Sequence, residues 1–169
     1  MIGPMVKAFS RPELLVSSEW LAEHLQRPEV RVVDVRWRPD GSGRSLHQVG
    51  HIPGAVYLDW ATELVDVEDE AGLFLLAGPD QVSTALARAG IGDGTSVVLY
   101  DDTASLFAAR VWWSLRVYGF ESARILDGGY RAWVGEDRPV SNALPSPAPA
   151  QFTARAQLRM RLTTADVRG

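Results

Sequence analysis

Apolar and β-branched residues cluster in short runs that alternate with stretches of helical periodicity. Four runs have the length and composition of buried strands, at residues 30–35, 55–58, 96–100 and 123–126. Apolar spacing predicts a helix from Ser17, its N-cap, to Pro28, and further helices over 79–89, 106–118 and 130–134. The remaining segments are expected to be irregular, with a flexible loop at 38–44 and helical fragments within 61–78.

This alternation of strands and helices defines the fold class. Successive parallel strands need right-handed crossovers, which place helices on both faces of the sheet. We therefore expect an α/β protein with a three-layer α/β/α architecture and a central, mainly parallel sheet. Ligands of such sheets bind beyond the carboxyl ends of strands, which directs attention to the loop after Tyr100.

The chain divides into four predicted parts. Residues 1–12 form an irregular lead-in, and residues 13–140 form the domain. Residues 141–158 are rich in proline and predict a stiff, extended linker. The segment Leu162–Val167 repeats the pattern of Val16–Leu21, so residues 159–169 are predicted to begin a second, truncated copy of the domain.

Composition narrows the possible functions. The 169 residues suit one domain, and a net charge of −4 with no basic stripe argues against a nucleic-acid partner. The absence of cysteine excludes a thiol nucleophile within these residues, and three scattered histidines lack metal-ligand spacing. We expect no cofactor and no membrane segment, and a cytoplasmic location.

The loop Asp101-Asp102-Thr103-Ala104-Ser105 is the main candidate for chemistry. Backbone N–H groups between a buried strand and a helix N-terminus favour anions, and Asp101 and Asp102 are expected to cap these donors. A nucleophilic Asp101, as in haloacid-dehalogenase-like phosphatases, would need a second acid two residues on to bind magnesium. Position 103 is Thr. Ser105 lacks the glycines of a nucleophile elbow, so we expect a helix N-cap.

Other polar and aromatic residues near the strand ends favour structural roles. His51, in a turn of glycine and proline, is expected to orient neighbours through hydrogen bonds rather than to act as a catalyst. Asp34 and Arg36 flank the end of a strand and are expected to form an ion pair. Trp37 and Phe107 either pack in the core or form a patch that contacts another domain.

Four stretches together resemble the rhodanese family, specifically the tandem thiosulfate and 3-mercaptopyruvate sulfurtransferases. They cover residues 14–140 in the family's order. The stretches are GHIPGA at 50–55, VVLYDD at 97–102, ARVWW with VYG at 109–119, and LDGGYRAW at 126–133. The structural motif implied by the resemblance includes Asp34, Arg36, His51 and Arg110.

The resemblance also implies a role. In active members, a cysteine opens the loop after the strand and carries sulfur as a persulfide, and Asp101 stands at that position here. It implies an inactive N-terminal copy whose partner is a second rhodanese domain of the same polypeptide, with Trp37, Leu106 and Phe107 lining the inter-domain cleft. The complete protein would transfer sulfane sulfur from a small donor anion, thiosulfate or 3-mercaptopyruvate, to a thiophilic acceptor. The alternative is a stand-alone, inactive rhodanese module for binding or regulation.

Overall fold

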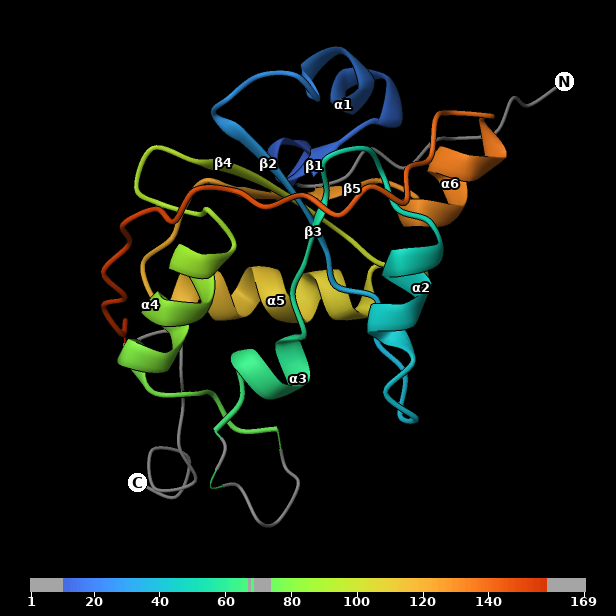
Figure 1. The fold of residues 1–169 in the computed structure, drawn as a ribbon. Coiled ribbons are helices and arrows are strands. Elements are labelled where there is room, and N and C mark those ends of the chain that lie inside the picture. The colour runs from blue at the N-terminus through green and yellow to red at the C-terminus, as the bar shows by residue number, and fades with distance from the viewer. Residues whose placement is uncertain (1–10, 67, 69–73, 158–169) are drawn as a thin grey trace, which may run out of the picture.

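A five-stranded, all-parallel sheet runs through the centre of the domain (Figure 1). The structure, a computed structural model, describes residues 11–66, 68 and 74–157. The strand order is β1 (Leu15–Val16), β5 (Ala123–Leu126), β4 (Ser96–Tyr100), β2 (Val30–Asp34) and β3 (Val56–Tyr57). The central strands β4 and β2 therefore end side by side, with Tyr100 in register with Asp34.

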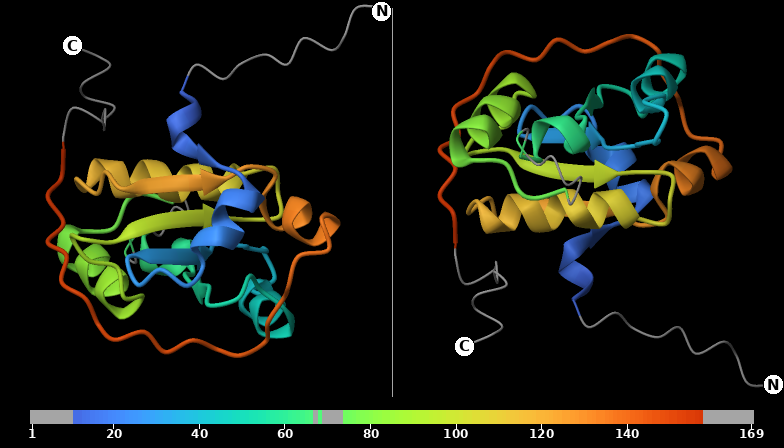
Figure 2. Two further views of the ribbon diagram at one scale, coloured as in Figure 1. Left: turned by 90° about the horizontal axis from the view of Figure 1, so that it is seen from above. Right: turned by 90° about the horizontal axis from the view of Figure 1, so that it is seen from below.

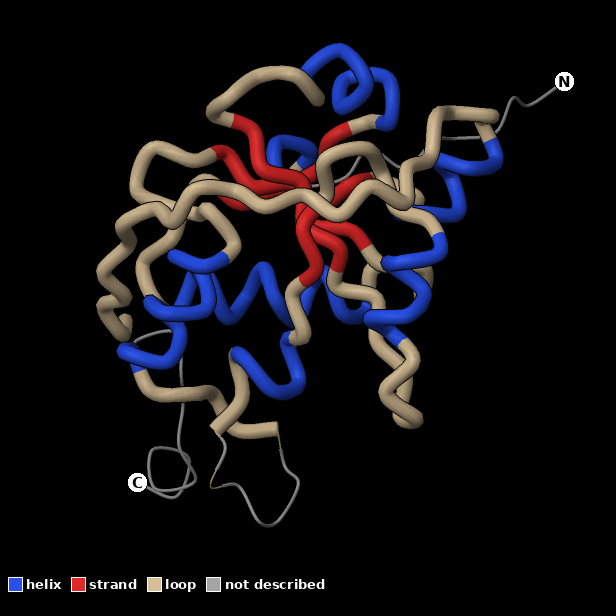
Figure 3. Tube along the Cα trace, viewed as in Figure 1, coloured by secondary structure: helices blue, strands red, loops and turns tan. Residues whose placement is uncertain are grey.

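Helices cover both faces of this sheet, as the tube representation shows (Figure 3). A short 3-10 turn, η1 (Pro12–Leu14), precedes β1. The helices are α1 (Ser18–His24), α2 (Gly43–Val49), α3 (Trp60–Glu63), α4 (Pro79–Arg88), α5 (Leu106–Val117) and α6 (Gly129–Gly135). The expected three-layer α/β/α architecture is confirmed.

Side chains of β4 alternate between two hydrophobic cores because successive residues of a strand point to opposite faces. Val97 and Leu99 pack with the buried residues of α4 and α5. Val98 and Tyr100 pack on the other face with residues such as Leu21 of α1 and Trp133 of α6. Both faces of β4 are thus apolar, as expected for a central parallel strand.

Most predicted elements lie where the sequence placed them. Ser17 caps α1, its Oγ accepting a hydrogen bond from the N–H of Trp20 at 3.1 Å. Besides the short turn η1, two elements were missed. The predicted loop at 38–44 is wrong at its end, because α2 begins at Gly43, where a Cβ would lie 2.4 Å from the carbonyl oxygen of Arg36 and only glycine fits. The edge strand β1 has only two residues, too few for a hydrophobic period.

The proline-rich segment after α6 is extended and lies along the domain (Figure 2). Its backbone is anchored at several points: Ser141 pairs with His51, the N–H of Ala150 donates to Ala87, and that of Arg155 donates to Tyr118. Phe152 packs edge-on against Phe120, with ring centroids 5.4 Å apart. The predicted linker therefore covers one side of this domain. The predicted start of a second copy, at 159–169, lies outside the described residues.

Candidate functional site

The loop after β4 places Asp101 between the central strand and α5, as expected. Asp101 is 1% exposed. Its Oδ1 accepts hydrogen bonds from the N–H groups of Thr103 at 2.7 Å and Ser105 at 3.0 Å. Its Oδ2 accepts from those of Phe107 at 2.7 Å and Ala108 at 2.8 Å. The carboxylate of the chain itself thus occupies the anion cradle formed by the loop and the start of α5.

Ser105 corrects one prediction. It occupies the N-cap position of α5, but its side chain makes no capping hydrogen bond. Its backbone is left-handed, with φ 65°, as is that of Ala104, with φ 54°. This conformation turns the N–H of Ser105 inward to Asp101, four residues earlier, which supplies the capping carboxylate instead.

The turn at Gly128 and Gly129 packs directly against the same loop. The N–H of Tyr130 donates to the carbonyl oxygen of Asp101 at 2.8 Å. Gly129 has φ +58°, and a Cβ added there would lie 2.4 Å from that same oxygen. Only glycine combines this backbone conformation with so close an approach. The glycine pair at 128–129, seen in the sequence as a motif, therefore holds the Asp101 loop in place.

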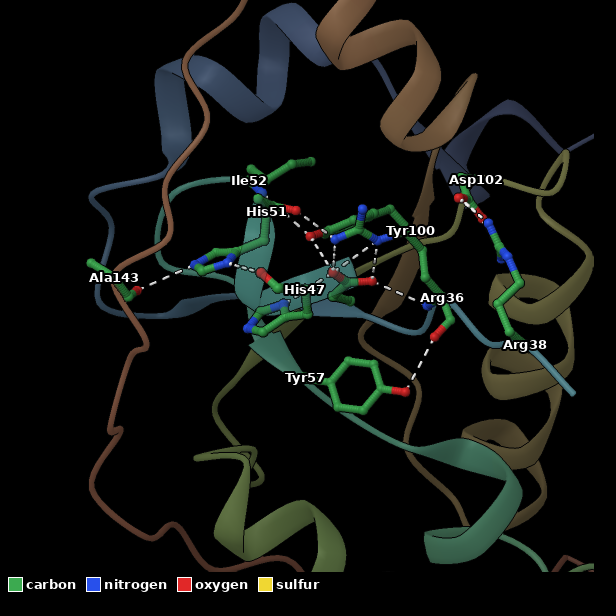
Figure 4. Close-up of polar contacts among 11 residues, drawn as sticks. Arg36, Arg38, His47, His51, Ile52, Tyr57, Tyr100, Asp102 and Ala143 are labelled. Carbon is green, nitrogen blue, oxygen red and sulfur yellow. Dashed lines mark hydrogen bonds and ion pairs between the residues drawn. The ribbon is translucent and has the colours of Figure 1, made fainter. Parts of the chain in front are cut away.

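Arg38 ties the neighbouring loop to Asp102 and was not predicted (Figure 4). Its two terminal nitrogens donate to the two carboxylate oxygens at 3.0 and 2.6 Å. The hydrogen bond to Asp102 raises the pKa of the Arg38 guanidinium above its usual value. Asp102 therefore binds a side chain, not the backbone donors that it was expected to cap. Sequence offered no signal for a pair separated by 64 positions.

Beneath this loop lies a buried network around Asp34 (Figure 4). The predicted ion pair is present: Arg36 Nε and Nη2 donate to the carboxylate of Asp34, Nη2 at 2.6 Å. Tyr100 donates its hydroxyl to Asp34 Oδ2 at 2.9 Å, and His47 Nδ1 lies 3.0 Å from the same atom. Burial raises the pKa of the Tyr100 hydroxyl, which keeps it protonated as a donor.

His51 lies at the edge of this network and is fully buried. Its Nδ1 lies 2.7 Å from the carbonyl oxygen of His47 and its Nε2 lies 3.2 Å from that of Ala143 (Figure 4). These contacts connect the end of α2 to the extended C-terminal segment. The orienting role of His51 stays a prediction.

Trp37 and Phe107 meet in an aromatic cluster, their ring centroids 5.6 Å apart. Trp60 and Phe74, which were not predicted, complete it. Phe74 is 42% exposed and the adjoining Leu106 is 63% exposed. Trp37 and Phe107 pack against the core, which is one of the two possibilities left open for them. Contact of this cluster with another domain stays a prediction.

Arg110 lies beside this cluster. Its guanidinium stacks over Trp113, 4.7 Å from the ring centroid, and donates to the carbonyl oxygen of Phe74. Partial burial lowers the pKa of the guanidinium. Within residues 11–66, 68 and 74–157, no group of three or more potential ligands could hold a metal ion. No helix of the same described residues is long and apolar enough to cross a membrane.

Together, the parallel sheet and the loop define an α/β domain with an anion cradle at the carboxyl end of its central strand. A family profile described as a Rhodanese-like domain matches residues 17–136. The chain therefore belongs to the family of Rhodanese-like domains.

Similar proteins include several with sulfur-related names. The sulfur carrier protein TtuD of Thermus thermophilus is 34% identical over 146 residues, covering 85% of this chain and 47% of that protein. Human 3-mercaptopyruvate sulfurtransferase is 35% identical over 155 residues, covering 85% and 50%. The crystal structure of the 3-mercaptopyruvate sulfurtransferase SseA from Escherichia coli superposes with a TM-score of 0.84 at 29% identity, covering 91% and 60%. The chain spans about half the length of the curated relatives it matches.

Proposed function

We propose that this chain is the non-catalytic half of a two-domain sulfurtransferase, in which it supports a second rhodanese domain. The observation that carries the proposal is the sealed cradle, where four backbone N–H groups bind the carboxylate of Asp101. By the resemblance, this is the position at which active members carry a cysteine persulfide. A buried carboxylate cannot accept sulfane sulfur, and the 169 residues contain no cysteine to replace it.

The chemistry would then belong to a cysteine thiolate in the second domain. That thiolate attacks the sulfane sulfur of thiosulfate and releases sulfite, or takes sulfur from 3-mercaptopyruvate and releases pyruvate. The resulting persulfide passes its outer sulfur to cyanide or a thiol, which regenerates the thiolate. The relatives' names and their roughly doubled length support this division of labour.

The aromatic cluster would form one wall of the cleft between the two domains. Its exposed part, Leu106 and Phe74, presents large apolar side chains to the surface beside Trp37 and Phe107. An apolar wall of this kind excludes water from a reactive sulfur. The small donor anion would be bound by cationic groups of the second domain.

Cyanolysis assays on two forms of the protein test this proposal. The 169-residue chain and the product of the complete gene are compared with thiosulfate and with 3-mercaptopyruvate as donors. We expect turnover only from the complete protein, accompanied by a persulfide detected by mass spectrometry. Turnover by the 169-residue chain would overturn the proposal. A complete gene product without a downstream cysteine would favour a stand-alone binding module instead.

A further inference from the structure

A pocket of about 260 Å³ lies away from the Asp101 loop, between α2, β3, the end of α4 and the extended C-terminal segment. Its polar lining comes from Arg44, His47, Tyr57 and Arg88, among other residues. Leu144, Pro145 and Pro147 close one side. This volume is slightly below the range of about 300–1,000 Å³ typical of pockets for drug-sized ligands, so the occupant must be small.

His47 lines this pocket and has one ring nitrogen without a hydrogen bond to a described residue. The residue is 3% exposed, and its Nδ1 contacts Asp34 at 3.0 Å. Although burial alone would raise it, the hydrogen bonds from His47 and Arg36 hold the pKa of Asp34 below its ordinary value. Because an ionised carboxylate only accepts, the proton of this contact lies on Nδ1. In the neutral ring, Nε2 therefore carries a lone pair.

No hydrogen bond joins Nε2 to any residue that the structure describes. Figure 4 shows this nitrogen turned away from Arg36 and Tyr100. Among the described residues, Nε2 is not one of the fully buried side-chain atoms left without a partner, so water or a small ligand in the pocket can reach it and supply that partner. In the neutral ring this nitrogen accepts a hydrogen bond, so the partner that we consider is a donor.

The charges around the pocket specify the rest of the ligand. Arg44 precedes His47 by three positions on α2, so both side chains lie on the same face of the helix. Its guanidinium stacks on Tyr57, 4.9 Å from the ring centroid, and makes no ion pair with a described carboxylate. Arg88 adds a second positive charge, paired with Glu63. None of the residues described as lining the pocket is acidic.

We propose that this pocket binds a small oxyanion that also carries an acidic hydroxyl, such as hydrogen phosphate. Its negative oxygens pair with Arg44 and Arg88, and its hydroxyl donates to Nε2 of His47. Sulfate and thiosulfate match the charge but lack the hydroxyl at neutral pH. The site is therefore separate in both place and chemistry from the cleft proposed above.

Titration of the isotope-labelled chain with inorganic phosphate, at constant ionic strength and pH 7.5, tests this by NMR. We expect saturable shifts of the His47 Nε2 resonance and of amides around α2 and residues 144–147. Arg44→Gln should raise the dissociation constant about tenfold, because it removes a charge-assisted hydrogen bond. The exposed Arg131→Gln, which removes the same charge elsewhere, should leave it unchanged.

Sulfate is the matched ligand control and should bind about tenfold more weakly, because it leaves Nε2 without a donor. The proposal is overturned if phosphate produces no saturable shift, if both arginine variants weaken binding equally, or if sulfate binds as tightly as phosphate. None of these outcomes depends on sulfur transfer.

Discussion

Arg38 and Asp102 form a two-point ion pair that joins the segment after β2 to the loop after β4, with contacts of 3.0 and 2.6 Å. The side chains are 33% and 15% exposed. The pair lies directly beside Asp101, whose carboxylate binds the backbone of the same loop. Two successive aspartates therefore hold this loop in place, Asp101 through the backbone and Asp102 through an arginine.

A double-mutant cycle with Arg38→Gln and Asp102→Asn measures this pair. We expect a coupling free energy of about 1 kcal/mol, the upper end for exposed ion pairs, because the contact is bidentate and partly buried. Urea denaturation at 0.05 and 0.5 M salt gives the four unfolding free energies, and the coupling should fall with salt. A coupling of zero at low salt would show that the contact does not stabilise the loop.

Replacing Asp101 by Asn tests the sealed cradle. The amide has one accepting oxygen, so two of the four N–H donors would face its NH₂ group. We expect the free energy of unfolding to fall by about 2–4 kcal/mol. The matched control is Asp127→Asn, at an exposed position, which should change it by less than about 0.5 kcal/mol. Equal effects in the two variants would contradict the capping role.

Gly129→Ala should destabilise the domain by about 2 kcal/mol or more, because the added Cβ meets the carbonyl oxygen of Asp101 at a left-handed backbone position. Gly135→Ala, in the same helix, is the control. Nothing lies within 4 Å of a Cβ at that position, so the variant should be neutral or slightly more stable. Thermal denaturation of both variants checks the contrast. An unchanged midpoint for Gly129→Ala would refute the close approach.

The carboxyl group of Asp34 should titrate below its ordinary pKa of 3.8, because hydrogen bonds from His47 and Arg36 outweigh the effect of burial. Its ionised form then contributes stability above pH 3.8, and this contribution is lost as the pH falls through the lower, folded-state pKa. Carbon-13 NMR of the carboxyl resonance between pH 2 and 6 measures the midpoint. A midpoint above 3.8 would mean that burial dominates.

Leu106→Ser should lower the sulfurtransferase turnover of the complete protein while leaving the unfolding free energy of this domain almost unchanged. Leu106 is 63% exposed, so the change in unfolding free energy of the 169-residue chain should stay within about 0.5 kcal/mol. If the second domain packs here, the same substitution should lower sulfurtransferase turnover of the complete protein. Val49→Ser is the control, at a position of α2 that is 83% exposed, and it should leave the turnover unchanged. Equal turnover in the two variants would exclude this surface from the cleft.

The sequence predicted the fold well where local physics is strong. The apolar runs of β2 and β4 and the periodic helices α4 and α5 were located to within a residue or two, because burial imposes a period that one strand or helix displays by itself. It failed for α2 and for β1. Helix α2 begins at a glycine that packs closely against the chain, and β1 is too short to show a hydrophobic pattern. In both cases contacts with distant residues outweigh local preference.

The candidate site divides in the same way. The sequence alone determined that Asp101 follows a buried strand and precedes a helix, since these are facts of order along the chain. Only the tertiary structure decided which donors it binds, that Arg38 reaches Asp102, and that His47 contacts Asp34 and lines a pocket. Such contacts join residues far apart in the chain, and their partners are chosen by how the sheet and helices pack, which no local pattern records.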